Sequence, residues 1–95
     1  MDATAVYKKN ANVVVRHVGD DVVVVPIRHN VGDLDSVYTF NEVAAKVWSL
    51  LDGSRDVSAV IDGVCSEFDV SREVAERDVA ELFTELEAAR LVDRT

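Results

Sequence analysis

The hydrophobic period of this chain changes once, at Asn41, and that change most constrains its fold. Before Asn41 the apolar residues are mainly valines in short runs, and after it they recur every three or four positions. Valine branches at Cβ, so it suits a pleated strand better than a helix. A spacing of three to four residues is typical of an amphipathic helix. The sequence therefore predicts a sheet followed by helices.

Two valine-rich runs in the first half predict a β-hairpin. Val13–Val18 and Val22–Ile27 flank the short segment Gly19-Asp20-Asp21. A short Gly/Asp loop between two such runs is typical of a hairpin. Pro26 has no N–H to donate, so we expect it at a strand end or edge.

A third strand is predicted directly before the change of period. Residues 29–35 are rich in turn-forming types and predict a loop. Ser36–Phe40 then alternates, with aromatic or β-branched side chains at four positions. Tyr38 and Phe40 share one side of this strand, because side chains alternate between the two faces.

Three helices are predicted after Asn41. Asn41, Asp56 and Ser71 each stand before an apolar periodic stretch and are typical N-cap residues. Gly53 follows the first stretch and can adopt the left-handed conformation that ends a helix. With 95 residues, the chain is predicted to be a single α+β domain, residues 1–95. The residues expected to be buried together are Trp48, Leu51, Ile61, Phe68, Leu82 and Phe83.

The negative charge is concentrated in the helical half. The net charge is −8, and the residues from Asn41 onward contribute six basic and thirteen acidic side chains, or −7. A surface that binds nucleic acid must neutralise phosphates with Lys and Arg. We therefore expect no nucleic-acid partner.

The sequence carries no sign of a membrane or secreted protein. No apolar run approaches the roughly 18 residues that a membrane helix needs. The first residues lack the pattern of a secretory signal, and Cys65 is the single cysteine. We expect a cytoplasmic protein without a membrane partner.

No catalytic, metal or cofactor site is expected. His17 and His29 are the two histidines, and neither accompanies a nucleophile motif or a known metal-ligand spacing. No glycine-rich phosphate loop precedes a helix. The carboxylates of the last helix are typical of a solvated face. We therefore predict that the chain is not an enzyme.

Several motifs from Tyr38 onward resemble those of the PqqD family. They occur in the family's order and at its spacing. The residues that carry the resemblance are Tyr38-Thr39-Phe40-Asn41-Glu42, Val47-Trp48-Ser49-Leu50-Leu51-Asp52-Gly53, Glu67-Phe68-Asp69-Val70-Ser71, Asp78-Val79, Leu82-Phe83, Leu86 and Leu91-Val92.

The resemblance implies a winged helix-turn-helix-like fold and a non-catalytic role in peptide recognition. Proteins of this family bind the leader of a ribosomally made precursor peptide and act as a peptide chaperone for a modifying enzyme, often a radical S-adenosylmethionine enzyme. Pyrroloquinoline quinone biosynthesis is one such pathway, although Val24–Arg28 lacks the Pro-Glu-Gly turn associated with it. The leader is expected to add as a strand beside the third strand and against the third helix. The implied peptide-binding residues are Val37, Tyr38, Thr39, Phe40, Arg77, Asp78, Glu81 and Leu82.

Two other functions stay open on the sequence. A winged-helix DNA-binding regulator has a similar architecture, although its recognition helix would need fewer carboxylates than this chain carries. A structural module that only docks to a larger protein is the third interpretation. The expected oligomeric state is a monomer or a weak edge-to-edge dimer, because an exposed sheet edge can pair with a second copy.

Overall fold

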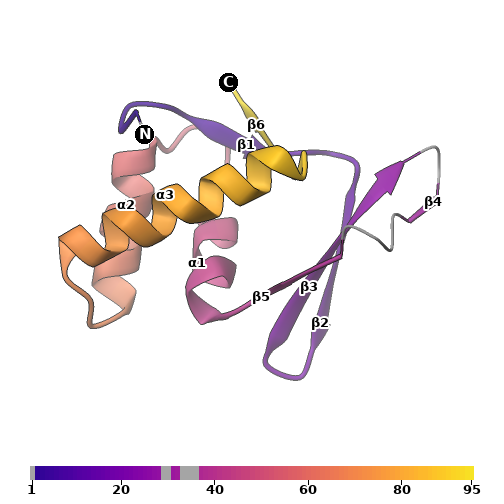
Figure 1. The fold of residues 1–95 in the computed structure, drawn as a ribbon, viewed down its shortest axis with the longest axis horizontal. Helices are drawn as coiled ribbons and strands as arrows, with labels where there is room; N and C mark the ends of the chain where they lie inside the picture. The colour runs from indigo at the N-terminus through magenta and orange to yellow at the C-terminus, as the bar shows by residue number, and fades with distance from the viewer. Residues whose placement is uncertain (1, 29–30, 33–36) are drawn as a thin grey trace.

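The computed structural model of this chain describes residues 2–28, 31–32 and 37–95. Within them lie a four-stranded antiparallel sheet, a two-stranded sheet and three helices (Figure 1). The predicted α+β class is confirmed. The strands are β1 (Tyr7–Lys9), β2 (Val13–Val18), β3 (Asp21–Arg28), β4 (Val31–Gly32), β5 (Tyr38–Phe40) and β6 (Val92–Arg94), and the helices are α1 (Glu42–Leu50), α2 (Val57–Glu67) and α3 (Arg72–Ala88).

The predicted hairpin is present, and its second strand is the centre of the larger sheet. β2 and β3 are joined by a two-residue turn, since Val18 pairs with Asp21. Gly19 supplies the positive φ of +60° that such a turn requires. β3 pairs with β2 along one edge and with both β5 and β4 along the other.

The prediction of three strands is incomplete. β1 and β6, from opposite ends of the chain, pair with each other, and Tyr7 lies opposite Arg94. Strands of three residues are too short to show an alternating period in the sequence. β4 lies within the loop predicted at residues 29–35, and the rest of that loop lies outside the described residues. The predicted third strand, Ser36–Phe40, is observed as β5, which begins at Tyr38. Val37 lies just before the strand, and Ser36 lies outside the described residues.

The helix starts are confirmed at all three predicted caps. The side chains of Asn41, Asp56 and Ser71 each accept a hydrogen bond from the backbone N–H three residues later, at 2.9, 2.8 and 3.2 Å. Gly53, just after α1, has the expected positive φ of +80°. No helix in the described ranges is long and apolar enough to span a bilayer.

One core joins the sheet to the helices. Phe40 of β5 packs against Trp48 of α1 with ring centroids 5.6 Å apart, and Phe83 of α3 is fully buried. The prediction of burial is wrong for Phe68 and Leu82, which are only half-buried against this core. Phe68 follows the last turn of α2 as its C-cap, and Leu82 lies at the margin of the apolar stripe of α3.

The N-terminal strand β1 is held against α3 by an aromatic contact. Tyr7 of β1 stacks on Phe83, with ring centroids 4.6 Å apart, and its hydroxyl donates a hydrogen bond to Glu87 Oε1 at 2.6 Å. Burial, and then the nearby Glu87 carboxylate, raise the pKa of Tyr7 to about 12. The N-terminal segment and α3 are therefore joined by packing and by one long-range hydrogen bond.

We expect Trp48→Ala to lower the free energy of unfolding by about 3–5 kcal/mol, because it leaves a cavity beside Phe40. Urea unfolding followed by circular dichroism measures this change. Val18→Ala is the control, since Val18 is 61% exposed and its loss should change stability by less than about 0.5 kcal/mol. Equal midpoints for the wild type and Trp48→Ala would contradict the described packing.

Tyr7 should make the folded state less stable at high pH. Its pKa is higher in the folded chain than the ordinary value of 10, so stability from this group is present below pH 10 and is lost as the pH rises toward 12. Tyr7→Phe lacks this titration, and the difference in unfolding midpoint between wild type and variant should shrink or reverse over that range. A constant difference from pH 8 to pH 12 would exclude the described Tyr7–Glu87 contact.

Candidate functional site

β5 has one open edge. Among the described residues it pairs only with β3, so the edge that faces away from β3 carries no neighbouring strand. The backbone hydrogen bonds of the hairpin show which groups point to this edge. Ile27 N donates to Asn12 O at 2.7 Å, so these two residues form a hydrogen-bonded pair between β2 and β3. Such pairs alternate along an antiparallel ladder. The main-chain groups of Val22 and Val24 therefore face β5.

The same alternation fixes the direction of the main chain in β5. Val22 pairs with Phe40 and Val24 pairs with Tyr38, so these are the hydrogen-bonded pairs between β3 and β5. The N–H and C=O of Thr39, between them, point away from β3. A strand added at this edge would find an unpaired donor and acceptor at Thr39.

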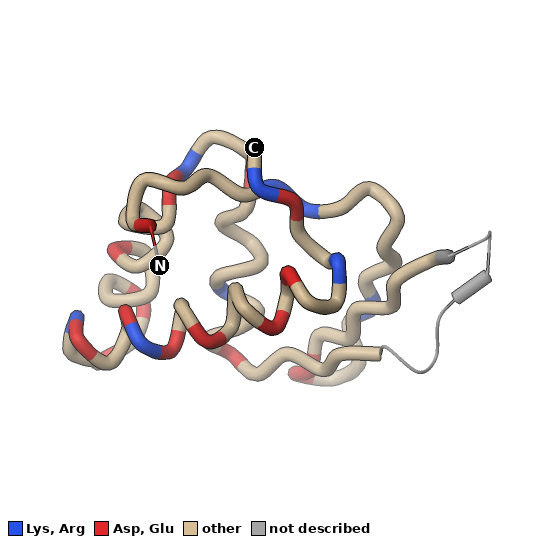
Figure 2. The backbone as a smooth tube through the Cα atoms, turned by 45° about the horizontal axis from the view of Figure 1, so that its top comes forward, with Lys and Arg blue, Asp and Glu red and all other residues tan. Residues whose placement is uncertain are grey.

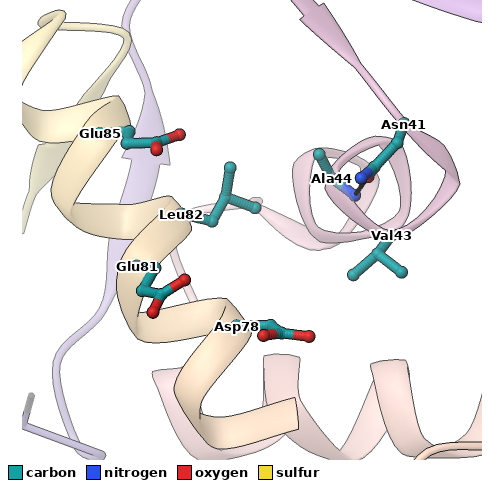
Figure 3. A pocket seen from close by; sticks show the side chains of 7 residues that line it. All are labelled: Asn41, Val43, Ala44, Asp78, Glu81, Leu82 and Glu85. Atoms are coloured by element: carbon teal, nitrogen blue, oxygen red, sulfur yellow. Dashed lines mark hydrogen bonds between the residues drawn. The ribbon is translucent and has the colours of Figure 1, made fainter. Parts of the chain in front are cut away.

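A groove with a volume of about 330 Å³ lies between the start of α1 and one face of α3. Figure 3 shows the side chains of α3 pointing across it toward Asn41, Val43 and Ala44. Asn41 directly follows β5, so the groove adjoins the end of that strand. Val43, Ala44 and Leu82 supply its apolar surface. The α3 residues that line it are Asp78, Glu81, Leu82 and Glu85.

The acidic side of the groove follows from the way α3 packs. Val79, Phe83 and Leu86 are buried and fix which face of the helix meets the core. Residues three, four or seven positions apart share a helix face, so Asp78, Glu81 and Glu85 come together at the groove. Figure 2 shows acidic residues spaced along the whole of α3.

The groove is lined by three carboxylates and by no basic side chain. Asp78 has a cation close by, since Arg77 Nε lies 3.7 Å from its Oδ1. Glu81 and Glu85 are exposed, and among the described residues neither has a hydrogen-bond or ion-pair partner in its side chain. Within the described residues, the groove therefore presents two negative charges without a partner beside an apolar surface.

The groove is lined by acidic, amide and aliphatic side chains. Its lining contains no serine, threonine, cysteine, histidine or lysine. In residues 2–28, 31–32 and 37–95, no three or more His, Cys, Asp or Glu side chains are grouped so that they could hold a metal ion. An open strand edge beside a groove is instead an arrangement that can hold an extended peptide.

Residues 21–92 match the family model described as coenzyme PQQ synthesis protein D (PqqD). The chain belongs to the PqqD family. The matched region begins at β3 and includes β5, the groove and all of α3. The resemblance in the sequence motifs is thereby confirmed. None of the curated proteins matches the chain.

A solved structure similar to this PqqD-family chain is described as TbiB1 in complex with the TbiA(beta) leader peptide. It is 26% identical to this chain, with a TM-score of 0.74. The alignment covers 90% of this chain and 94% of TbiB1. The likeness therefore extends over nearly the whole fold.

The structure places the four sequence-predicted residues of the third strand in different surroundings. Thr39 is exposed at the open edge, and Val37, just before β5, is 41% exposed. Tyr38 is half-buried, and the side chain of Phe40 is buried against Trp48. Phe40 thus anchors the strand to the core, whereas Thr39 presents its main chain to solvent.

Three of the four residues predicted on α3 line the groove: Asp78, Glu81 and Leu82. Arg77 lies beside the groove, and its side chain is 66% exposed. The structure therefore brings most of the predicted helix residues together with the end of β5, across a single concave surface.

Sequence reasoning missed four residues of the groove: Asn41, Val43, Ala44 and Glu85. A signal was available for Glu85, because it stands four residues after Glu81 and so shares its helix face. Asn41 was assigned only a capping role, and its place in the groove depends on how α1 packs beside α3.

Asn41→Ala should remove the cap that begins α1 at the groove. The Asn41 side chain accepts a hydrogen bond from Ala44 N at 2.9 Å, and its loss should cost about 0.5–2 kcal/mol of stability in urea unfolding. Asn41→Asp keeps the acceptor and should stay close to the wild type. Equal losses in both variants would show that the cap hydrogen bond is not what stabilises this helix start.

Proposed function

We propose that this PqqD-family chain is a non-catalytic recognition domain for the leader of a ribosomally made precursor peptide. The leader adds as a strand to the open edge of β5 and lies against α3. The main observation in support is the outward direction of the Thr39 N–H and C=O beside the groove. Main-chain pairing holds an extended peptide of almost any sequence, while side-chain pockets select among sequences.

The comparison with TbiB1 supports the same function. That protein is described in complex with a leader peptide, and its fold matches 90% of this chain. Since the identity is only 26%, the two chains share an architecture more than a set of side chains. This difference is expected if main-chain pairing is common to both and the preferred peptide differs.

The recognition domain presents the peptide to a separate modifying enzyme, which in our proposal is of the radical S-adenosylmethionine type. The family resemblance supports this enzyme class, and the groove agrees with a division of labour, because its lining offers polar and aliphatic side chains that can bind a peptide. Four of the predicted site residues then act directly at the peptide edge and groove: Thr39, Asp78, Glu81 and Leu82.

The alternative of a DNA-binding regulator is disfavoured by the charge of α3. This helix occupies the position of a recognition helix, after the turn that follows α2. It contains two arginines, Arg72 and Arg77, against six acidic residues. A helix with that excess of carboxylates would be repelled by phosphates in a DNA groove.

Thr39→Pro should weaken leader binding roughly three- to tenfold, because it removes one main-chain donor at the open edge and leaves the pairing with β3 intact. Fluorescence polarisation with the leader encoded by a short reading frame beside this gene measures the change. His17→Pro is the matched control, since the alternation of hydrogen bonds directs the N–H of His17 away from β3 at the opposite edge of the sheet.

Amide chemical-shift mapping with the same leader tests the placement independently. The expected perturbations lie in β5, the first turn of α1 and α3. Equal weakening by Thr39→Pro and His17→Pro, or perturbations confined to β2 and β3, would refute strand addition at β5. Circular dichroism of both variants establishes that they are folded.

A further inference from the structure

Two glutamates of α3, Glu81 and Glu85, line the groove without a side-chain partner among the described residues, and they determine which side chains the groove can select. Glu81 and Glu85 stand beside the apolar surface formed by Val43, Ala44 and Leu82. A side chain that fits both surfaces needs an aliphatic stem and a positive end. Lysine and arginine have this form, since their methylene groups pack on apolar residues while the charged group stays at the margin.

The spacing of the two carboxylates matches the repeat of an extended peptide. Glu81 and Glu85 are four residues apart in α3, which at 1.5 Å per residue is about 6 Å along the helix axis. Alternate residues of a strand are about 6.6–6.8 Å apart and point to the same face. Figures 1 and 2 show the axes of β5 and α3 running in roughly the same direction. Successive same-face residues of an added strand would therefore meet successive glutamates.

The face of the added strand that meets α3 is fixed by β5. The side chain of Phe40 is buried toward the helices, and Tyr38 lies on the same side. Side chains of directly opposite residues in neighbouring strands share a face. Peptide residues opposite Tyr38 and Phe40 would therefore point toward the helices and the groove, and those opposite Thr39 would point away.

We propose that the peptide selected by this groove carries lysine or arginine at two alternate positions, i and i+2, one for Glu81 and one for Glu85. This inference rests on the proposed function, because it assumes a strand added at β5. Asp78 contributes less than the other two carboxylates, since Arg77 already lies 3.7 Å from it. A metal ion is not an equivalent occupant, because within the described residues the carboxylates do not form a metal-holding group.

The test is selection of peptides from a yeast-displayed library of random 12-residue sequences on the purified chain. The expected result is enrichment of Lys or Arg at i and i+2. Peptides with the same two basic residues at i and i+1 should bind more weakly, because adjacent residues of a strand point to opposite faces. This comparison matters because a net charge of −8 attracts any cationic peptide to some extent.

Glu81→Gln combined with Glu85→Gln should weaken binding of a selected peptide roughly 2- to 30-fold, the range for two exposed ion pairs. The loss of affinity should be smaller in high salt, because salt screens the attraction between the two glutamates and the basic peptide side chains. Glu73→Gln is the control, because Glu73 is exposed on α3 and does not line the groove. It should change affinity less than about twofold.

The outcomes separate this inference from the proposed function. Selected peptides that bind at β5 by chemical-shift mapping but lack the i, i+2 basic pair would overturn the inference and leave the proposed function in place. Equal effects of the Glu81/Glu85 double variant and Glu73→Gln would also overturn it. A selection that yields no peptide bound at β5 would overturn both.

Discussion

The alternation of main-chain hydrogen bonds along β3 is the constraint on which the candidate site depends. The two-residue turn at Gly19 sets the register of β2 and β3, and the bond from Ile27 to Asn12 carries that register to the end of the hairpin. Every second residue of β3 must then face β5. Thr39 is left with its N–H and C=O directed outward because its neighbours on either side are paired with β3. The turn and the register of β5 against β3 together decide which main-chain atoms of β5 are open to a partner.

The helical core completes the site by holding α3 opposite the end of β5. Phe83 packs on Tyr7 from the N-terminal strand, and Phe40 packs on Trp48. These contacts bury one face of α3 and one face of β5, so the next faces of each border the groove. The acidic margin of the groove follows from the same packing. Carboxylates spaced three or four residues apart share the helix face next to the buried stripe, and that face borders the groove. Stability and recognition thus use adjoining faces of the same elements.

The predictability of this structure differs between local and long-range features. The caps Asn41, Asp56 and Ser71 were predictable, because each acts on a backbone N–H only three residues away. The pairing of β1 with β6 was not, since it joins the two ends of the chain through three-residue strands. Burial was predicted for Leu82 from its helical period alone, and the structure places it at the groove margin instead, because α1 does not cover that part of α3.

By itself, the sequence determined the valine hairpin, the strand before Asn41, the three helices and their starts, the family and three of the α3 residues that line the groove: Asp78, Glu81 and Leu82. These depend on interactions between near neighbours and on motifs in a single stretch of chain. Only the tertiary structure decided the outward direction of the Thr39 main chain and the meeting of the α1 start with Glu85. The physical reason is that both depend on the register between strands and on the packing of helices that are far apart in the sequence.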